Sequence, residues 1–184
     1  MILFPQDVTM IDFKSDLIVF SLDSYHSPQL RTANVVKDLI GKKRIFFIES
    51  PVFGVSSHPT YFIQKSDDDV NVVKPYLPAE ISVFEQKTML DGIVQELIED
   101  ENIHHYSIWT DTPRAMPYIR HMNPELLVYD CLVDHSTSHL ALERELFKRA
   151  HVVITSGLSV DNHGPALHGF IEHSKSSSTE LYHR

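Results

Sequence analysis

Short apolar runs alternate with amphipathic segments along this chain, which is the pattern of repeated β-strand and α-helix units. The segment Leu17–Leu22 is apolar at nearly every position, as expected of a strand that is covered on both faces of a sheet. The same reasoning predicts four more strands, at Ile45–Ile48, Tyr106–Trp109, Leu126–Tyr129 and Val152–Thr155.

Amphipathic segments between these runs predict the helices. Pro28 is placed to open a helix that continues to about Ile40 and stops at Gly41. The clearest helix covers Val83–Glu99, where apolar residues recur at three- and four-residue steps. Two further helices are predicted, from Pro113 to about Met122 and over Ser138–Arg149.

A β-hairpin interrupts the alternation. Thr60–Gln64 and Val70–Lys74 read as its two arms, closed over the polar turn Ser66–Asp69, and Pro75 and Pro78 are expected to end it. The predicted fold class is therefore α/β, a doubly wound and mostly parallel Rossmann-like sheet with a small hairpin excursion. Right-handed crossovers follow from the twist of the strands.

Length and composition fit one domain. With 184 residues, of which 42% are hydrophobic, the chain can bury one sizeable core. We expect a single Rossmann-like domain over residues 1–172. Residues 173–184, which include three consecutive serines, are expected to form a flexible tail.

The net charge of −9 argues against nucleic acid as a partner, because a phosphate-backbone binder needs a basic face. No apolar stretch approaches the ~20 residues that span a bilayer. Met1–Asp12 has no basic region or cleavage site of a signal peptide. Cys131 is the only cysteine, which fits a reducing compartment, so a cytoplasmic location is expected.

Neither a metal nor a cofactor is expected. Only His135 and His139 have the i, i+4 spacing that places two imidazoles on one helix face, and Ser136 stands where the zinc motif needs a glutamate. Cys131 could act as a nucleophile with His135 as its base. Its place directly after a buried strand favours a small buried side chain instead.

Ligands of doubly wound sheets bind outside the carboxyl ends of the strands. That rule selects the segments to inspect for chemistry, which are Ser21–Arg31, Glu49–Gly54, Thr110–Arg114, Asp130–Ser138 and Ser156–Val160. Ser21–Ser27 contains no glycine, so a tight pyrophosphate turn after the first strand is not expected.

Five segments of the chain are similar to segments of one known protein family. Arg44–Gly54 reads RIFFIESPVFG and is similar to RVFFIEEPIFG, and Val72–Pro78 reads VVKPYLP and is similar to VVVPHLP. Ser107–Pro113 (SIWTDTP) resembles VLWYYTP, Leu127–Cys131 (LVYDC) resembles TVYDC, and Leu142–Ala150 (LERELFKRA) resembles LERELLRRAD. By the order and spacing of these motifs, residues 16 to about 160 resemble the N-terminal domains of bacterial GT-B glycosyltransferases of the group-one-like kind, which act in polysaccharide and cell-envelope synthesis.

The resemblance implies an acceptor-binding half of a nucleotide-sugar-dependent glycosyltransferase, whose donor domain is absent from this chain. The partners would be a sugar or lipid-linked acceptor and, through a missing or separate domain, a nucleotide-sugar. Peripheral association with a membrane is left open. The WxxxxQRPQ motif that follows the first strand in the family is not kept. Only its arginine has a counterpart in this chain, which is Arg31.

Candidate site residues follow from the strand ends and the resemblance. Asp134 and His135 are the candidates for orienting or deprotonating an acceptor hydroxyl. Arg31 could pair with an anionic acceptor group, and aromatic rings beside it could stack on a sugar. The candidates for acceptor binding are Tyr25, His26, Arg31, Glu49, Thr112 and Asp130.

Each assignment has a structural alternative. Asp130 could cap the turn that follows its strand, and Tyr25 and His26 could cover apolar surface at a helix start. The whole chain could also be a non-catalytic Rossmann-like interaction module that pairs with a separate partner chain.

Overall fold

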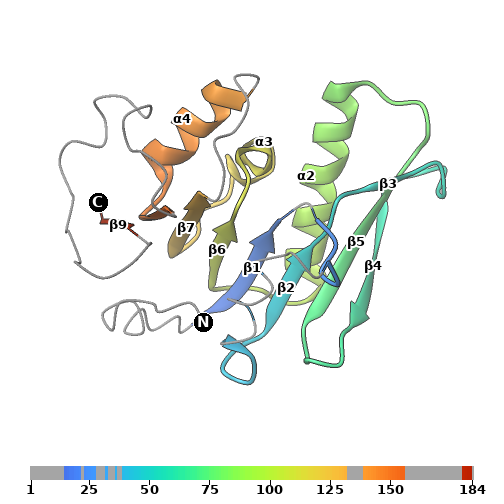
Figure 1. Ribbon diagram of the computed structural model, residues 1–184. Coiled ribbons are helices and arrows are strands. Elements are labelled where there is room, and N and C mark those ends of the chain that lie inside the picture. Colours follow the sequence, from blue (N-terminus) through green and yellow to red (C-terminus); the bar gives the residue numbers. More distant parts are fainter. Residues whose placement is uncertain are drawn as a thin grey trace.

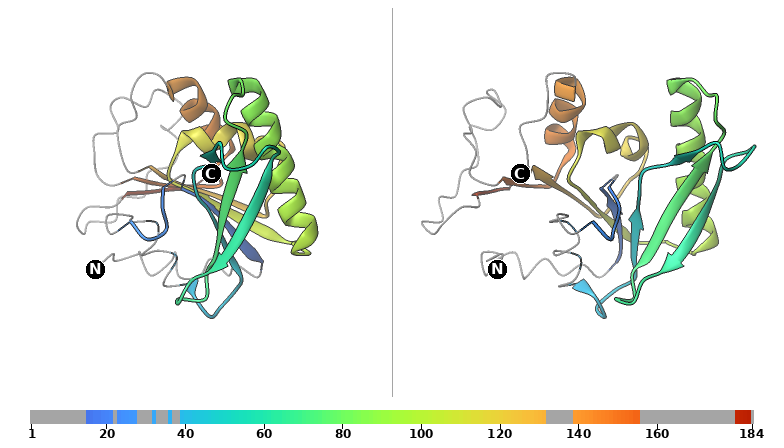
Figure 2. Two further views of the ribbon diagram at one scale, coloured as in Figure 1. Left: turned by 90° about the vertical axis from the view of Figure 1, so that its right-hand side faces the viewer. Right: turned by 45° about the vertical axis from the view of Figure 1, so that its right-hand side comes forward.

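The computed structural model describes residues 15–21, 23–27, 32, 36, 39–131, 139–155 and 180–183. In this part of the chain nine strands form one sheet, with helices on one side of it (Figures 1 and 2). The elements in chain order are β1 (Asp16–Phe20), β2 (Ile45–Ile48), β3 (Val52–Phe53), β4 (Thr60–Lys65), β5 (Asn71–Leu77), α2 (Val83–Asp100), β6 (Tyr106–Thr110), a 3₁₀ turn (Pro113–Ala115), α3 (Met116–Ile119), β7 (Leu126–Cys131), α4 (Leu140–Arg149), β8 (Val152–Thr155) and β9 (Glu180–His183).

The sheet has the strand order of a Rossmann fold. Strands β5-β2-β1-β6-β7-β8 lie side by side in that order, and all of these neighbours are parallel. Numbered by their place in the chain, they follow the doubly wound order 3-2-1-4-5-6. The α/β fold class predicted from the hydrophobic pattern is therefore confirmed. The short β3 also pairs with β5, and β4 and β9 add antiparallel neighbours.

The expected hairpin is present, but its second arm plays a larger part than predicted. β4 pairs antiparallel with β5, while β5 also pairs in parallel with β2 and so belongs to the main sheet. Pro75 lies inside β5, opposite Tyr61, and does not end it. The carbonyl oxygens of Val73 and Leu77 both accept bonds from the β2–β3 side, so the Pro75 nitrogen faces that side too, just beyond the end of β2. A missing N–H is tolerated at such a position.

Both faces of the central strands are buried. Along β1, Ile18 and Phe20 belong to the core under α2, α3 and α4, whereas Leu17 and Val19 belong to a second core on the opposite face. Figures 1 and 2 show these three helices on the same side of the sheet. The second core also contains Tyr25, which follows β1.

The α2 helix follows its sequence closely. Ser82 caps its N-terminus in a reciprocal capping box with Glu85, and Leu90, Ile93 and Leu97 are among its buried residues. The predicted Pro113–Met122 helix is instead a 3₁₀ turn followed by the short α3. The predicted helix from Pro28 lies mostly outside the described residues, and the Gly41 expected to stop it has a φ of 75°.

Two predictions concern the chain's C-terminal part and its relation to membranes. β9, antiparallel to β8, lies within the stretch expected to be a tail, and the sequence pattern did not predict it. The domain boundary at residue 172 stays a prediction. In the part of the chain that the structure describes, no helix combines the length and the apolar character needed to cross a membrane.

Candidate functional site

The site begins where the chain changes direction in the sheet. After β1 the chain builds outward through β2 and β5, then returns to add β6 on the other side of β1. The carboxyl ends of β1 and β6 therefore flank the topological switch point, which is the usual ligand position in this fold. The Thr110 hydroxyl joins the two ends by donating to the Phe20 carbonyl oxygen at 2.8 Å.

A row of buried polar side chains crosses the sheet at this level. Phe20 is in register with Ile48 and Thr110, and Thr110 is in register with Tyr129. The next residue of each strand faces the side opposite α2, because successive side chains of a strand alternate. These next residues are Ser21, Glu49, Asp111 and Asp130, and none is more than 8% exposed.

Asp111 is the carboxyl group of this row that lies at the switch point itself. Its Oδ2 accepts hydrogen bonds from the hydroxyl of Ser21, at 2.8 Å, and from the hydroxyl of Thr32. Burial raises the pKa of Asp111 to about 6, although the bonds from Thr32 and Ser21 act to lower it, and the nearby charge of Asp23 adds to the rise. The result is a sheltered carboxyl group that titrates close to neutral pH.

Glu49, Tyr25 and His26 were predicted as acceptor-binding residues, and the structure brings them together. Glu49 Oε1 accepts from the Tyr25 backbone N–H at 2.9 Å and from the Ser24 hydroxyl at 3.2 Å. The Tyr25 ring is buried, and the exposed His26 packs edge-on against it with centroids 5.4 Å apart. Together they form the loop that leads away from β1.

Thr112, another predicted acceptor-binding residue, serves the turn after β6. Its Oγ1 caps the 3₁₀ turn by accepting from the Arg114 N–H at 3.3 Å, and its own N–H lies 3.3 Å from Thr110 Oγ1. The side chain is half-buried. Its hydroxyl therefore shapes the rim of the site.

Asp130 lies in the same row, at the end of β7, and is 0% exposed. In this structure it presents no surface to an acceptor. Arg31, Asp134 and His135 fall outside the described residues, so their predicted roles stay predictions.

The sequence reasoning missed Asp111, Ser21 and Thr32. Asp111 and Ser21 had an available signal, because each directly follows a buried strand, as Glu49 does. Thr32 had none, because only the packing of the segment after the first loop brings its hydroxyl to Asp111, 79 residues away in sequence.

Cys131 belongs to a separate buried network on the other face of the sheet. Glu143 Oε1, near the start of α4, accepts from the Tyr129 hydroxyl at 3.1 Å and lies 3.9 Å from Cys131 Sγ. Burial raises the pKa of the Cys131 thiol to about 11, which disfavours the nucleophilic thiolate. These contacts support the interpretation of Cys131 as a structural side chain.

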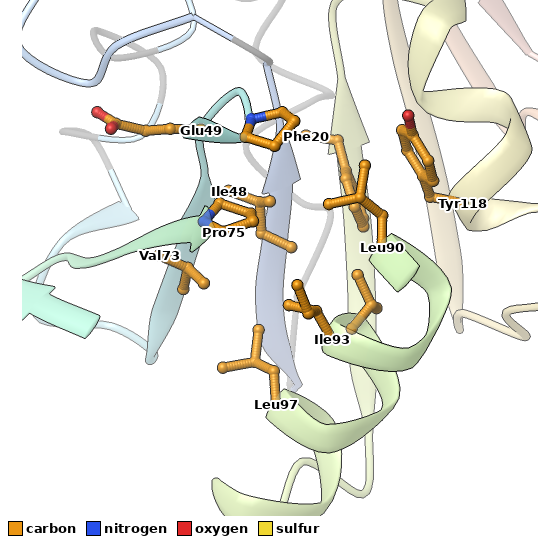
Figure 3. A pocket seen from close by; sticks show the side chains of 11 residues that line it. Phe20, Ile48, Glu49, Val73, Pro75, Leu90, Ile93, Leu97 and Tyr118 are labelled. Atoms are coloured by element: carbon orange, nitrogen blue, oxygen red, sulfur yellow. The ribbon is translucent and has the colours of Figure 1, made fainter. Parts of the chain in front are cut away.

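Two further features bear on the site, namely its potential metal ligands and an apolar cavity under α2. The residues that the structure describes contain no group of three or more His, Cys, Asp or Glu side chains able to hold a metal ion. The cavity between α2 and the sheet is lined by apolar side chains such as Leu90, Ile93 and Leu97 (Figure 3). Its volume of about 10 Å³ is no larger than one water needs, so it is a packing void.

Comparisons with known proteins add little about function. No family model matches the chain, and no curated protein matches it. One similar solved structure is an α,α-trehalose-phosphate synthase (UDP-forming) from Burkholderia xenovorans in complex with glucose-6-phosphate, with 14% identity and a TM-score of 0.44 over 72% of this chain and 37% of that one. Another is an E. coli structure described as trehalose-6-phosphate bound with UDP-2-fluoro glucose, with 10% identity and a TM-score of 0.45 over 73% and 38%.

The chain thus spans a little over a third of the length of these two proteins. At such scores the likeness carries no argument about activity or ligands, and the fold assignment stands on the strand order itself.

Proposed function

We propose that this chain is the acceptor-binding half of a nucleotide-sugar-dependent glycosyltransferase, with Asp111 as the general base for the acceptor hydroxyl. The observation that carries the proposal is the buried Asp111 carboxyl at the switch point between β1 and β6, with a pKa of about 6. The ordered motifs from residue 16 to about 160 motivate the glycosyltransferase class.

Asp111 suits this role chemically. A general base works best when its pKa lies near the working pH, because it is then both ionised and basic enough to accept a proton. Ser21 and Thr32 both donate to Oδ2 and fix the carboxylate in place. In an inverting transfer, the acceptor oxygen would bond to the sugar's anomeric carbon as its proton passes to Asp111 and the nucleoside diphosphate leaves.

We place the nucleotide-sugar mainly on another domain or chain. The loop after β1 has no glycine between Ser21 and Ser27, so it offers no tight turn for a pyrophosphate. Asp134, His135 and Arg31 remain candidates for contacts with the acceptor.

Trp109 provides the measurement. It is the only tryptophan, it is buried, and it precedes Asp111 by two residues on the same face of the sheet. We expect the fluorescence of Trp109 to change in a saturable way when one class of sugar or sugar-phosphate acceptor is added. Asp111→Ala should weaken that binding about tenfold or more, because a hydrogen bond to a charged group contributes roughly 1.5–3 kcal/mol.

Asp67→Ala is the matched control, since Asp67 is an exposed carboxylate at the tip of the β4–β5 turn, and it should bind as the parent chain does. Nucleotide-sugars should bind weakly or not at all. Tight nucleotide-sugar binding by the isolated chain would contradict the proposed division of labour.

The second candidate is a non-catalytic interaction module. It is favoured by exposed apolar side chains at two connections, the one after β3 and the one between β5 and α2. The Gly54 N–H, at the start of the first, donates to the carbonyl oxygen of Leu77, at the start of the second, at 2.9 Å. Phe53, Val55, Val83 and Phe84 are between 45% and 85% exposed. Such patches often mark contacts between proteins. A module of this kind would bind none of the sugars in the titration.

A further inference from the structure

Glu49 is buried at the carboxyl end of β2, beside the switch point, and all of its contacts are internal. Besides the bonds from the Tyr25 N–H and the Ser24 hydroxyl to Oε1, its Oε2 lies 3.2 Å from the Lys74 ammonium. Figure 3 shows the carboxylate pointing away from the apolar cavity under α2. A carboxylate that is only 5% exposed needs such partners, because burying a lone charge is costly.

The loop that Glu49 holds is also fixed at a second point. The Tyr25 ring packs edge-on against Phe47, with centroids 5.2 Å apart, and its hydroxyl donates to Asp68 Oδ2 at 3.2 Å. The backbone of Tyr25 is therefore tied to β2 and its side chain to the β4–β5 turn. These contacts hold the loop in position.

The loop connects the two residues that hold Asp111. Ser21 precedes the residues bound by Glu49, and Thr32 follows them. A shift of the loop would therefore move both hydroxyls relative to Asp111 Oδ2. The neighbouring carboxylate whose charge raises the pKa of Asp111 is Asp23.

We propose that Glu49 is a positioning residue of the acceptor site, which acts on Asp111 through the loop and its flanking hydroxyls Ser21 and Thr32. This inference rests on the proposed function, because it assigns Asp111 as the group to be positioned. Glu49 was predicted to contact the acceptor directly, whereas the contacts above give its oxygens to the protein's own loop.

A double-mutant cycle tests the coupling without any ligand. The readout is the midpoint of the pH-dependent change in Trp109 fluorescence that the titration of Asp111 causes. The change is assigned to Asp111 because it should be absent from Asp111→Asn. Ser21→Ala should raise this midpoint, because it removes a hydrogen bond that lowers the pKa and leaves the burial unchanged. In a Glu49→Asp background, whose shorter side chain cannot reach the loop, the rise should fall to less than half.

Two further backgrounds separate geometry from charge. Glu49→Gln keeps the length and an acceptor oxygen, so the full effect of Ser21→Ala should be restored. Glu80→Asp, the same change at an exposed glutamate, should leave the effect untouched. If Glu49→Asp does not fold cooperatively, Ser24→Ala replaces it. Ser24 is exposed, and its loss removes one of the two bonds to Oε1, so it should reduce the rise by a smaller amount.

The outcomes distinguish this inference from the proposed function. An undiminished effect of Ser21→Ala in the Glu49→Asp background, or in the Ser24→Ala background where that variant replaces it, would overturn the positioning role, whatever the chain binds. A diminished effect supports the positioning of Asp111. If the parent chain then binds no acceptor, the proposed function alone fails.

Discussion

Asp111→Asn should make the protein more stable than the parent chain above pH 6. The pKa of Asp111 is raised from 3.8 in the unfolded state to about 6 in the fold, so folding favours the protonated form. The parent chain therefore has its full stability from this group below pH 3.8 and loses it as pH rises through 6. At 1.36 kcal/mol per unit, the ionised carboxylate costs on the order of 3 kcal/mol at pH 8, and asparagine avoids that cost.

Urea unfolding at pH 4 and pH 8 measures this difference. The two proteins should differ little at pH 4, where Asp111 is mostly protonated, and most at pH 8. The control is Asp67→Asn on the exposed turn, which should follow the parent chain at both values. A variant that is less stable than the parent at pH 8 would show that the hydrogen bonds from Ser21 and Thr32 outweigh burial. Asp111 would then be a structural carboxylate.

Local periodicity predicted those elements whose signal lies within their own residues. The predicted strand Ile45–Ile48 matches β2, and the predicted start of α2 at Val83 is confirmed. The role of β5 could not be read in this way, because its place beside β2 depends on a pairing between segments about 25 residues apart. Pro75 looked like the end of a strand because the sequence does not reveal that its nitrogen faces the gap between the pairings of β5 with β2 and with β3.

The candidate site was predicted in part, because the ends of strands can be read from the sequence whereas tertiary contacts cannot. The rule that ligands bind at the carboxyl ends of strands selected Glu49 and Asp130, which do belong to the buried row. In the segment after β6 the predicted residue was Thr112, which is the neighbour of Asp111 in sequence. Thr32 was out of reach, since its contact with Asp111 is made by tertiary packing. The internal role of Glu49 likewise depends on partners from two other segments, the loop after β1 and strand β5.

The buried Glu143 leads to the second large expected effect. Glu143→Ala should destabilise the fold by about 3 kcal/mol, because it leaves the hydroxyl of the fully buried Tyr129 without its acceptor and opens a cavity under α4. The matched control on the same helix is Glu145→Ala. Glu145 pairs with Arg120 on the surface, where both side chains are about one-third exposed, so its loss should cost less than about 1 kcal/mol.

Removing both members of the buried pair completes the test. Tyr129→Phe alone takes away the hydroxyl that donates to the Glu143 carboxylate, and it should also be destabilising. In the double variant Tyr129→Phe/Glu143→Leu no polar group of the pair is left unsatisfied, so its loss in the free energy of unfolding should be clearly smaller than the sum of the losses in Tyr129→Phe and Glu143→Leu. Chemical denaturation of the parent chain and of each variant measures these free energies of unfolding. If Glu143→Ala cost no more than Glu145→Ala, the buried network would contribute no net stability, and Glu143 would have to be kept for a reason other than the fold.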